Sequence, residues 1–254
     1  MDTPSGTRSF WGLNFIGTAL IALAIVIGAL AIAGAYKYKF KTSQTIKVTG
    51  SAGTDFTSDL IVWNGSYSRN AYDLKGAYAL IKKDEENVKN YLISKGIKPE
   101  EMIFSSIKID RQFEYQYSDE GKVTGYRFTG YNLTQNIKVE SSDVAKVEAM
   151  AREITGLIET GIELNSPEPL YFYTKLADLK LDLLDKAAED ARKRAEIIAK
   201  NTNGTITGVS KATMGVFQIT GQNSNEDYSY GGAFNTTSKN KTASITVTLE
   251  CSVK

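Results

Sequence analysis

An uninterrupted apolar segment stands near the beginning of the chain and predicts a membrane-spanning helix. No acidic or basic residue lies between Arg8 and Lys37, and the 22 residues 15–36 are almost all apolar. As a helix rising about 1.5 Å per residue, they span the roughly 30 Å of bilayer hydrocarbon. A cleaved signal peptide is the alternative, because residues 31–33 and 33–35 both fit a small-x-small cleavage pattern. The apolar run is longer than the 7–15 residues of a usual signal peptide, so we favour an uncleaved anchor.

Small residues follow one face of this predicted helix. Spacings of four and three residues align Gly17, Ile21, Ala24, Gly28, Ala31 and Ala35. Small side chains allow two helices to approach closely in lipid, which predicts an oligomer interface in the membrane. The alternative is that any span rich in alanine and glycine matches some such pattern.

The charges on the two sides of the apolar segment bear on its orientation. The N-terminal flank holds Arg8 and Asp2, whereas the C-terminal flank holds Lys37, Lys39, Lys41 and Lys47. By the positive-inside rule, these lysines would place the large C-terminal part in the cytoplasm.

Alternating and helical patterns succeed one another in the remaining residues and predict an α+β domain with antiparallel strands and three helices. Period-two patterns predict strands near 45–50, 60–67, 107–117, 123–139, 205–220 and 243–253, with a short strand at 161–164 or 170–173. Helical spacing predicts helices near 71–95, 144–159 and 175–201. Asn70 is the expected N-cap of the first of these helices, and Gly50, Gly53 and Asp55 are the expected turn residues between the first two strands. The chain thus divides into a tail (1–14), a transmembrane helix (15–36), a linker (37–44) and one domain (45–254).

The clearest of these helices is the one at 175–201. Its apolar stripe comprises Leu176, Leu179, Leu183, Ala187, Ala191, Ala195 and Ile198. Opposite charges stand four residues apart on the outer face, at Asp182–Lys186, Glu189–Lys193, Asp190–Arg194 and Glu196–Lys200. Each such pair stabilises a helix by only about 0.2–0.5 kcal/mol.

A long polar segment at 221–242 separates the last two predicted strands. It is rich in Asn, Ser, Thr and Gly and carries Tyr228, Tyr230 and Phe234. We interpret it as a mobile loop, and loops of this length are usually either disordered or functional.

The composition removes several classes of chemistry. Histidine is absent and cysteine occurs once, at Cys251, which lies on the apolar side of the last strand. Catalytic triads and dyads that need imidazole are therefore excluded, as are an intramolecular disulfide and a zinc site of four cysteines. We expect no enzyme activity, no cofactor and no metal. The net charge of +1 argues against nucleic acid as a partner.

Aromatic side chains crowd the hairpin predicted at 107–139. They are Phe113, Tyr115, Tyr117, Tyr126, Phe128 and Tyr131. They could form a stacking platform for a glycan, as could Tyr228 and Tyr230 in the loop. Cross-strand packing or contact with another subunit is the simpler interpretation, because Tyr and Phe are ordinary strand residues.

Several short motifs, in their order along residues 45–254, resemble the SIMPL family of exported bacterial proteins. They are 46–50 (IKVTG), 58–60 (SDL), 125–128 (GYRF) leading to Asn132 and Leu133, and 187–199 (AAEDARKRAEIIA) followed by Gly204, Gly208 and Val209. Ser58 departs from the pattern, since many relatives have proline there. This family includes periplasmic and outer-membrane-associated immunogenic proteins, and it has no agreed catalytic residues.

The resemblance implies an α+β domain, export across the inner membrane and a tendency to form homo-oligomers. It therefore places residues 37–254 in the periplasm or outside the cell, against the lysine count. We accordingly expect a single-pass inner-membrane protein whose partners are the lipid bilayer, a second copy of itself and an envelope glycan or protein. Its expected role is in envelope integrity or the stress response.

Overall fold

The computed structural model describes the backbone of residues 11–39 and 45–254, so residues 1–10 of the expected tail and 40–44 of the expected linker lie outside the described residues. The first element is the helix α1 (Trp11–Lys39). Within it, Gly17–Lys37 has a mean hydropathy of 2.5, and none of its most apolar window is buried against the rest of the chain. Its 21 residues are long and apolar enough to cross a membrane, as the sequence predicts.

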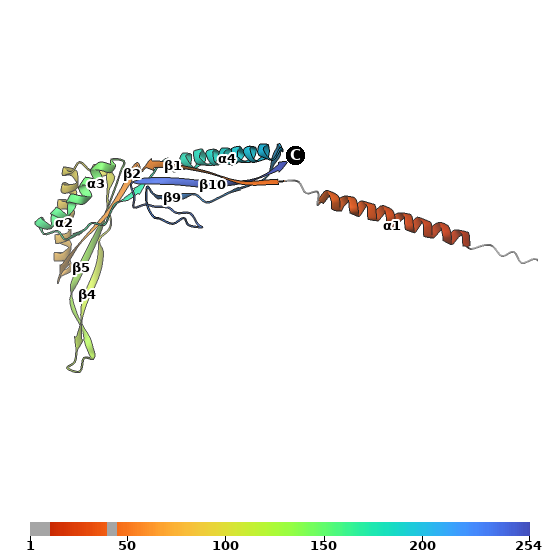
Figure 1. Cartoon of the computed structure of the whole chain (residues 1–254). Coiled ribbons are helices and arrows are strands. Elements are labelled where there is room, and N and C mark those ends of the chain that lie inside the picture. The colour runs from red at the N-terminus through yellow and green to blue at the C-terminus, as the bar shows by residue number, and fades with distance from the viewer. Residues whose placement is uncertain (1–10, 40–44) are drawn as a thin grey trace, which may run out of the picture.

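The first sheet is formed by segments from both ends of the described domain (Figure 1). It comprises β1 (Thr45–Thr57), β8 (Ile206–Met214), β9 (Gln218–Gly221) and β10 (Asn240–Val253). The strand β10 lies between β1 and β8, and its beginning pairs with β9. The helix α4 (Leu176–Asn201) covers one face of this sheet.

The alanine stripe of α4 lets this helix approach the sheet closely. Ala187 and Ala191 are completely buried against alternate apolar residues of β10, which include Cys251. A Cβ atom at Gly50 of β1 would lie 2.2 Å from the nitrogen of Ala191 and 2.5 Å from the carbonyl oxygen of Ala187. Gly50 is therefore required for helix–sheet contact.

The assignment of Gly50, Gly53 and Asp55 as turn residues is wrong. The strand β1 runs through all three, and the chain turns at Ser58 and Asp59, before β2. Glycine is a turn former by local preference, but here a tertiary contact with α4 overrides that preference.

The charged outer face of α4 forms most of the expected ion pairs. Lys186 pairs with Asp182, Lys193 with Glu189 and Arg194 with Asp190, whereas Glu196 pairs with Arg192 in place of Lys200. Asp190 also accepts a hydrogen bond of 2.9 Å from the backbone N–H of Ser51 in β1. The stripe differs at its end, where Ala199 is buried and Ile198 is exposed.

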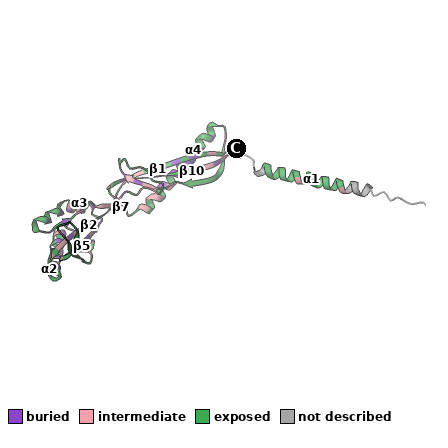
Figure 2. Ribbon diagram, turned by 90° about the horizontal axis from the view of Figure 1, so that it is seen from below, coloured by how far each residue is buried: buried purple, intermediate pink, exposed green. Residues whose placement is uncertain are grey.

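The second sheet carries the larger core, which Figure 2 shows in purple between β2, β5, α2 and α3. Its strands are β2 (Leu60–Ala71), β3 (Met102–Phe104), β4 (Lys108–Tyr117), β5 (Val123–Ser141), β6 (Leu164–Asn165) and β7 (Leu170–Phe172). The order is β3-β5-β2-β6, with β4 on β5 and β7 on β2. The helices α2 (Leu74–Ser94) and α3 (Val144–Glu153) and two short 3₁₀ helices, Pro99–Glu101 and Ile154–Thr160, complete this part. Trp63 of β2 is fully buried at its centre.

Several boundaries in this second part differ from the sequence prediction. The N-cap of α2 is Asp73, which accepts a bond of 2.8 Å from the N–H of Gly76, because β2 continues through Asn70 and pairs it with Asn132. The helix expected to reach residue 159 is α-helical only to Glu153 and then tightens to a 3₁₀ helix. The short strand expected at 161–164 or 170–173 is present in the second range as β7, whereas β6 overlaps the first range only at Leu164. The strand expected at 205–220 is divided into β8 and β9.

Candidate functional site

The hairpin of β4 and the first half of β5 projects from the body of the domain as an arm (Figure 1). Phe113 stands opposite Phe128 and Tyr115 opposite Tyr126 across the two strands. Opposed residues share a face, so these aromatic side chains gather on one side of the arm. A bulge beside Phe113 shifts the register and brings Tyr131 onto the same side.

The aromatic rings on this side form a row of two contacting groups, one around Phe128 and one around Tyr115. Ring centroids lie 5.0 Å apart for Tyr115 and Tyr126, 5.7 Å for Phe113 and Phe128, and 5.1 Å for Phe128 and Tyr131. Tyr117 extends the row toward the tip, 6.4 Å from Tyr115. The sequence prediction missed one member, Tyr72, which follows β2 directly and packs 5.6 Å from Phe128.

Most of this row stays uncovered by the rest of the chain. Tyr115 is 54% exposed and Tyr126 is 67% exposed. The opposite side of the arm is polar and carries an ion pair of 2.6 Å between Arg127 and Glu114. The arm therefore presents an aromatic face and a charged face, and only the charged face is typical of a surface that remains in water.

The small residues predicted for the membrane interface lie along α1 without contact to the domain. They are Gly17, Ala24, Gly28, Ala31 and Ala35, aligned with the larger Ile21, and none of the six is buried. A Cβ atom at Gly17 or Gly28 would meet no atom within 4 Å. The structure thus leaves this stripe accessible to a partner helix and identifies none.

The segment predicted as a mobile loop is tied to β9 by side-chain hydrogen bonds. The amide of Gln218 accepts from the N–H groups of Ser229 (3.1 Å) and Ala233 (2.8 Å) and donates to the carbonyl of Ser229 (2.8 Å). Glu226 accepts from the N–H of Gly221 at 2.9 Å and from the amide of Asn235. Tyr228 is 71% exposed and Tyr230 is fully exposed beside this anchored backbone.

A buried amine fastens the end of this segment to both sheets. Lys241 in β10 is only 3% exposed, and its Nζ atom donates to the carbonyls of Tyr171 in β7 (2.6 Å) and Asn235 (2.7 Å). Removal from water lowers the pKa of Lys241 to about 8, although the negative charge of Glu226 acts in the opposite direction. The sequence prediction missed this residue.

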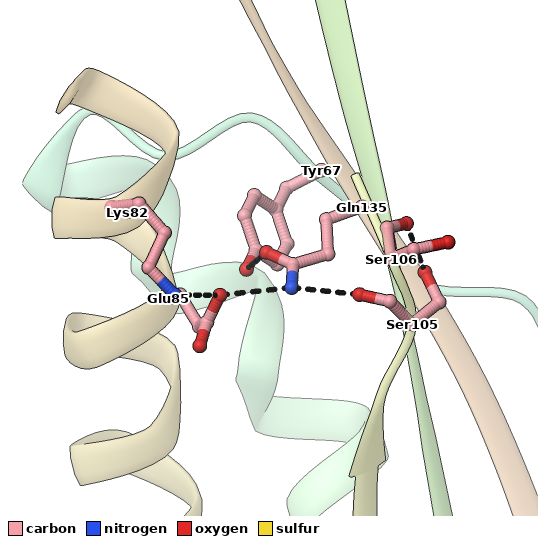
Figure 3. Close-up of polar contacts among 6 residues, drawn as sticks. All are labelled: Tyr67, Lys82, Glu85, Ser105, Ser106 and Gln135. Carbon is pink, nitrogen blue, oxygen red and sulfur yellow. Dashed lines mark hydrogen bonds and ion pairs between the residues drawn. The ribbon is translucent and has the colours of Figure 1, made fainter. Parts of the chain in front are cut away.

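A buried polar cluster joins α2 to the second sheet (Figure 3). The Oη atom of Tyr67 donates to Gln135 at 2.5 Å, and the amide nitrogen of Gln135 donates to Glu85 (2.8 Å) and to the carbonyl of Ser105 (3.0 Å). Burial, with the nearby negative charge of Glu85 and Asp84, raises the pKa of Tyr67 well above its ordinary value. Because Tyr67 is 2% exposed and the amide of Gln135 is fully used, this cluster positions α2 and offers no group to a substrate.

Acidic and sulfur-containing side chains do not converge on one point in the described part of the chain. Within residues 17–37 and 45–254, no three His, Cys, Asp or Glu side chains lie close enough to hold a metal ion together. The carboxylates instead form pairs, such as Asp84 with Arg69 and Glu148 with Lys239.

A comparison with family models agrees with the motifs in the sequence, whereas a search of curated proteins finds no match to this chain. The family model named SIMPL, described as a protein of unknown function (DUF541), matches residues 46–254. This range begins inside β1 and ends with the last residue after β10, so it includes both sheets and the aromatic arm. The chain therefore belongs to the SIMPL family.

Proposed function

We propose that this chain is a non-enzymatic envelope protein that is anchored in the inner membrane by α1 and self-assembles into a homo-oligomer. The contacts are made by the SIMPL domain and by the small-residue stripe of α1. The assembly serves envelope integrity or the response to envelope stress. The uncovered aromatic face of the arm is the observation that carries this proposal.

The arm suits a contact with a second copy of the same chain. Its aromatic rings follow the arm from Tyr131 at the base to Tyr117 near the tip. Aromatic residues are enriched in protein interfaces, and the same face of two copies can meet across a two-fold axis. The ion pair between Arg127 and Glu114 on the opposite side keeps that side in solvent.

The apolar helix supports the anchor, and membership of an exported family supports the orientation. The 21 residues of Gly17–Lys37 extend about 31 Å as a helix, which matches the bilayer hydrocarbon. We place the domain in the periplasm or outside the cell, although the lysines after α1 favour the cytoplasm by the positive-inside rule. Replacing Asn225, an exposed residue, by cysteine tests this placement, since the native Cys251 is buried. Labelling of intact cells by an impermeant reagent is expected, and labelling only after lysis would contradict the orientation.

Size measurement of the full chain in a mild detergent tests self-assembly. We expect a particle larger than one detergent-bound chain at about micromolar concentration, and a monomer there would contradict the proposal. The double variant Tyr115→Ser with Tyr126→Ser should shift the particle toward the monomer. The matched variant Tyr228→Ser with Tyr230→Ser removes two exposed tyrosines elsewhere and should leave the size unchanged.

The contribution of α1 is tested separately. Gly28→Leu places a large side chain on the small-residue stripe, where the single chain has free space, and should weaken the oligomer. Gly34 also has free space around it but lies off the stripe, so Gly34→Leu is the matched control. Equal effects of the two variants would remove α1 from the interface and leave the arm as the contact.

A second candidate function is binding of an envelope glycan or protein by the same arm. The tyrosines of the row favour it, because each combines a flat apolar ring with a polar hydroxyl. Nucleic acid is a poorer partner, since Arg127 is already paired with Glu114. If the Tyr115→Ser and Tyr126→Ser variant keeps its oligomeric size, this second function becomes the better explanation of the exposed face.

A further inference from the structure

A pocket lies between the anchored segment after β9 and the face of the first sheet that α4 does not cover. Its cavity volume is about 490 Å³, within the range of small-molecule sites. Ser51 of β1 and Thr246 of β10 stand side by side in the sheet register and line its floor, together with Ser244. Tyr228 and Tyr230 line it from the segment above. We call this cavity the loop pocket.

The backbone that carries the two tyrosines of the loop pocket is hydrogen-bonded to β9. Ser229, which lies between them, has its N–H and its carbonyl bonded to the side chain of Gln218. The hydroxyl of Tyr228 lies 3.4 Å from the hydroxyl of Ser244. A hydrogen-bonded backbone beneath two exposed aromatic rings reduces the ordering cost of binding.

The lining of the loop pocket defines the chemical class of its ligand. It combines two aromatic rings and apolar surface with the hydroxyls of Ser51, Ser244 and Thr246, and no Asp, Glu, Lys or Arg is among its described lining residues. Phosphate or carboxylate groups would require a cation there. A sugar ring meets these conditions, because its C–H face stacks on an aromatic ring while its hydroxyls exchange hydrogen bonds with Ser and Thr.

We propose that the loop pocket binds a neutral oligosaccharide, with sugar rings stacked on Tyr228 and Tyr230 and sugar hydroxyls bonded to the Ser and Thr side chains of the sheet. This binding is independent of self-assembly, because the aromatic row of the arm belongs to the other sheet. The side chain of Gln218, which also lines the loop pocket, holds the backbone between the two tyrosines.

Gly53 allows the cavity to be filled without disturbing the fold. It lines the loop pocket, and a Cβ atom there would approach no atom more closely than 3.4 Å. The variant Gly53→Val therefore occupies the space of the ligand, and valine is favoured in a strand. The variant Tyr228→Ala with Tyr230→Ala removes the stacking surface in a different way.

Calorimetric titration of the full chain tests the proposal. The chain is held in a detergent without a sugar headgroup. The neutral probes are chitotetraose, cellotetraose and maltotetraose. A heparin tetrasaccharide is the charged comparison, and a Ser/Thr-rich decapeptide is the peptide comparison. We expect at least one neutral probe to bind with a Kd below about 1 mM. Gly53→Val and the double tyrosine variant should each weaken this binding by about tenfold or more. The control variant Tyr78→Ala, which removes an exposed tyrosine of α2 outside both the arm and the loop pocket, should bind as the wild type does.

Three results would overturn the proposal. One is the absence of binding by all three neutral probes. Another is binding that survives in both loop-pocket variants. The last is tighter binding of the heparin fragment or the peptide than of any neutral sugar. Particle size is recorded for each variant, so that loss of sugar binding in an intact oligomer is distinguished from loss of the assembly.

Discussion

The buried amine of Lys241 makes the stability of this fold depend on pH in a direction opposite to that of an ordinary paired lysine. Its Nζ atom lies between β10, β7 and the segment that forms the loop pocket, and only 3% of the residue is exposed. Burial lowers its pKa from 10.5 to about 8 in the folded chain. The unfolded chain, in which the amine is in water, keeps the higher pKa.

The sign of the effect follows from proton binding. Between the folded and the unfolded pKa of Lys241, the unfolded state binds more protons, so stability rises with pH in this window. Going from about pH 7 to about pH 9.5, the two pKa values give a gain of about 2 kcal/mol in the free energy of unfolding. Well below the folded pKa, the amine is protonated in both the folded and the unfolded chain, so the free energy of unfolding no longer changes with pH.

Urea denaturation of the wild type and of Lys241→Met at several pH values measures this gain. The two curves of unfolding free energy against pH should diverge by about 2 kcal/mol across the window, because methionine carries no proton. Lys239→Met is the matched control, since Lys239 lies two residues away with its amine bonded to Glu148 and should keep the wild-type slope. Parallel curves for the wild type and Lys241→Met would refute the reasoning.

Three further changes test other parts of the fold. Gly50→Ala should lower the free energy of unfolding in urea by about 3 kcal/mol, because its Cβ would overlap the backbone of α4. Gly53→Ala in the same strand should stay within about 1 kcal/mol of the wild type. Equal effects of the two variants would contradict the close approach of α4. Arg69→Met should lower the free energy of unfolding by about 2–3 kcal/mol, because it leaves the buried carboxylate of Asp84 without its partner. Arg127→Met, at an exposed ion pair, should lower it by less than about 1 kcal/mol. Equal losses for the two variants would be inconsistent with burial of the Arg69–Asp84 pair. Burial and the hydrogen bond to Glu148 raise the pKa of Tyr171 to about 12, so alkaline absorbance titration should show a late step near this pH that Tyr171→Phe removes, whereas the still later ionisation of Tyr67 remains; an unchanged titration curve would refute this assignment.

Elements with a strong hydrophobic period were predictable from the sequence, and their junctions were not. The helix expected at 175–201 differs from α4 by one residue at its start, because seven apolar positions define a single face. The role of Gly50 depends on Ala187 and Ala191, which are distant in sequence, so local turn preference gave the wrong answer. The N-cap of α2 was misplaced for a related reason, since pairing with β5 extends β2 past Asn70.

In the candidate sites, too, residues that follow a periodic pattern were predictable, and residues joined across irregular segments were not. The aromatic row was predictable because strand alternation places residues on a common face, and only Tyr72, which lies outside the hairpin, was missed. Lys241 had a readable signal, since it lies in phase with the buried residues Ala243 and Ile245, but the last strand was expected to begin after it. The anchoring by Gln218 and Glu226 joins residues across an irregular segment, and no periodic pattern predicts such bonds.

The hydrogen bond from Ser51 to Asp190 has a consequence for how copies of this chain can add to one another. Within residues 45–254, β1 forms one edge of the first sheet and β8 and β9 form the other, and an open-ended fibre would grow by joining the β1 edge of one copy to the β8 edge of the next. An incoming strand at β1 would have to displace the Asp190 carboxylate, which Arg194 also holds, from the N–H of Ser51. Head-to-tail growth is thereby penalised at β1, whereas two β8 edges that meet across a two-fold axis form a closed pair and displace no such bond.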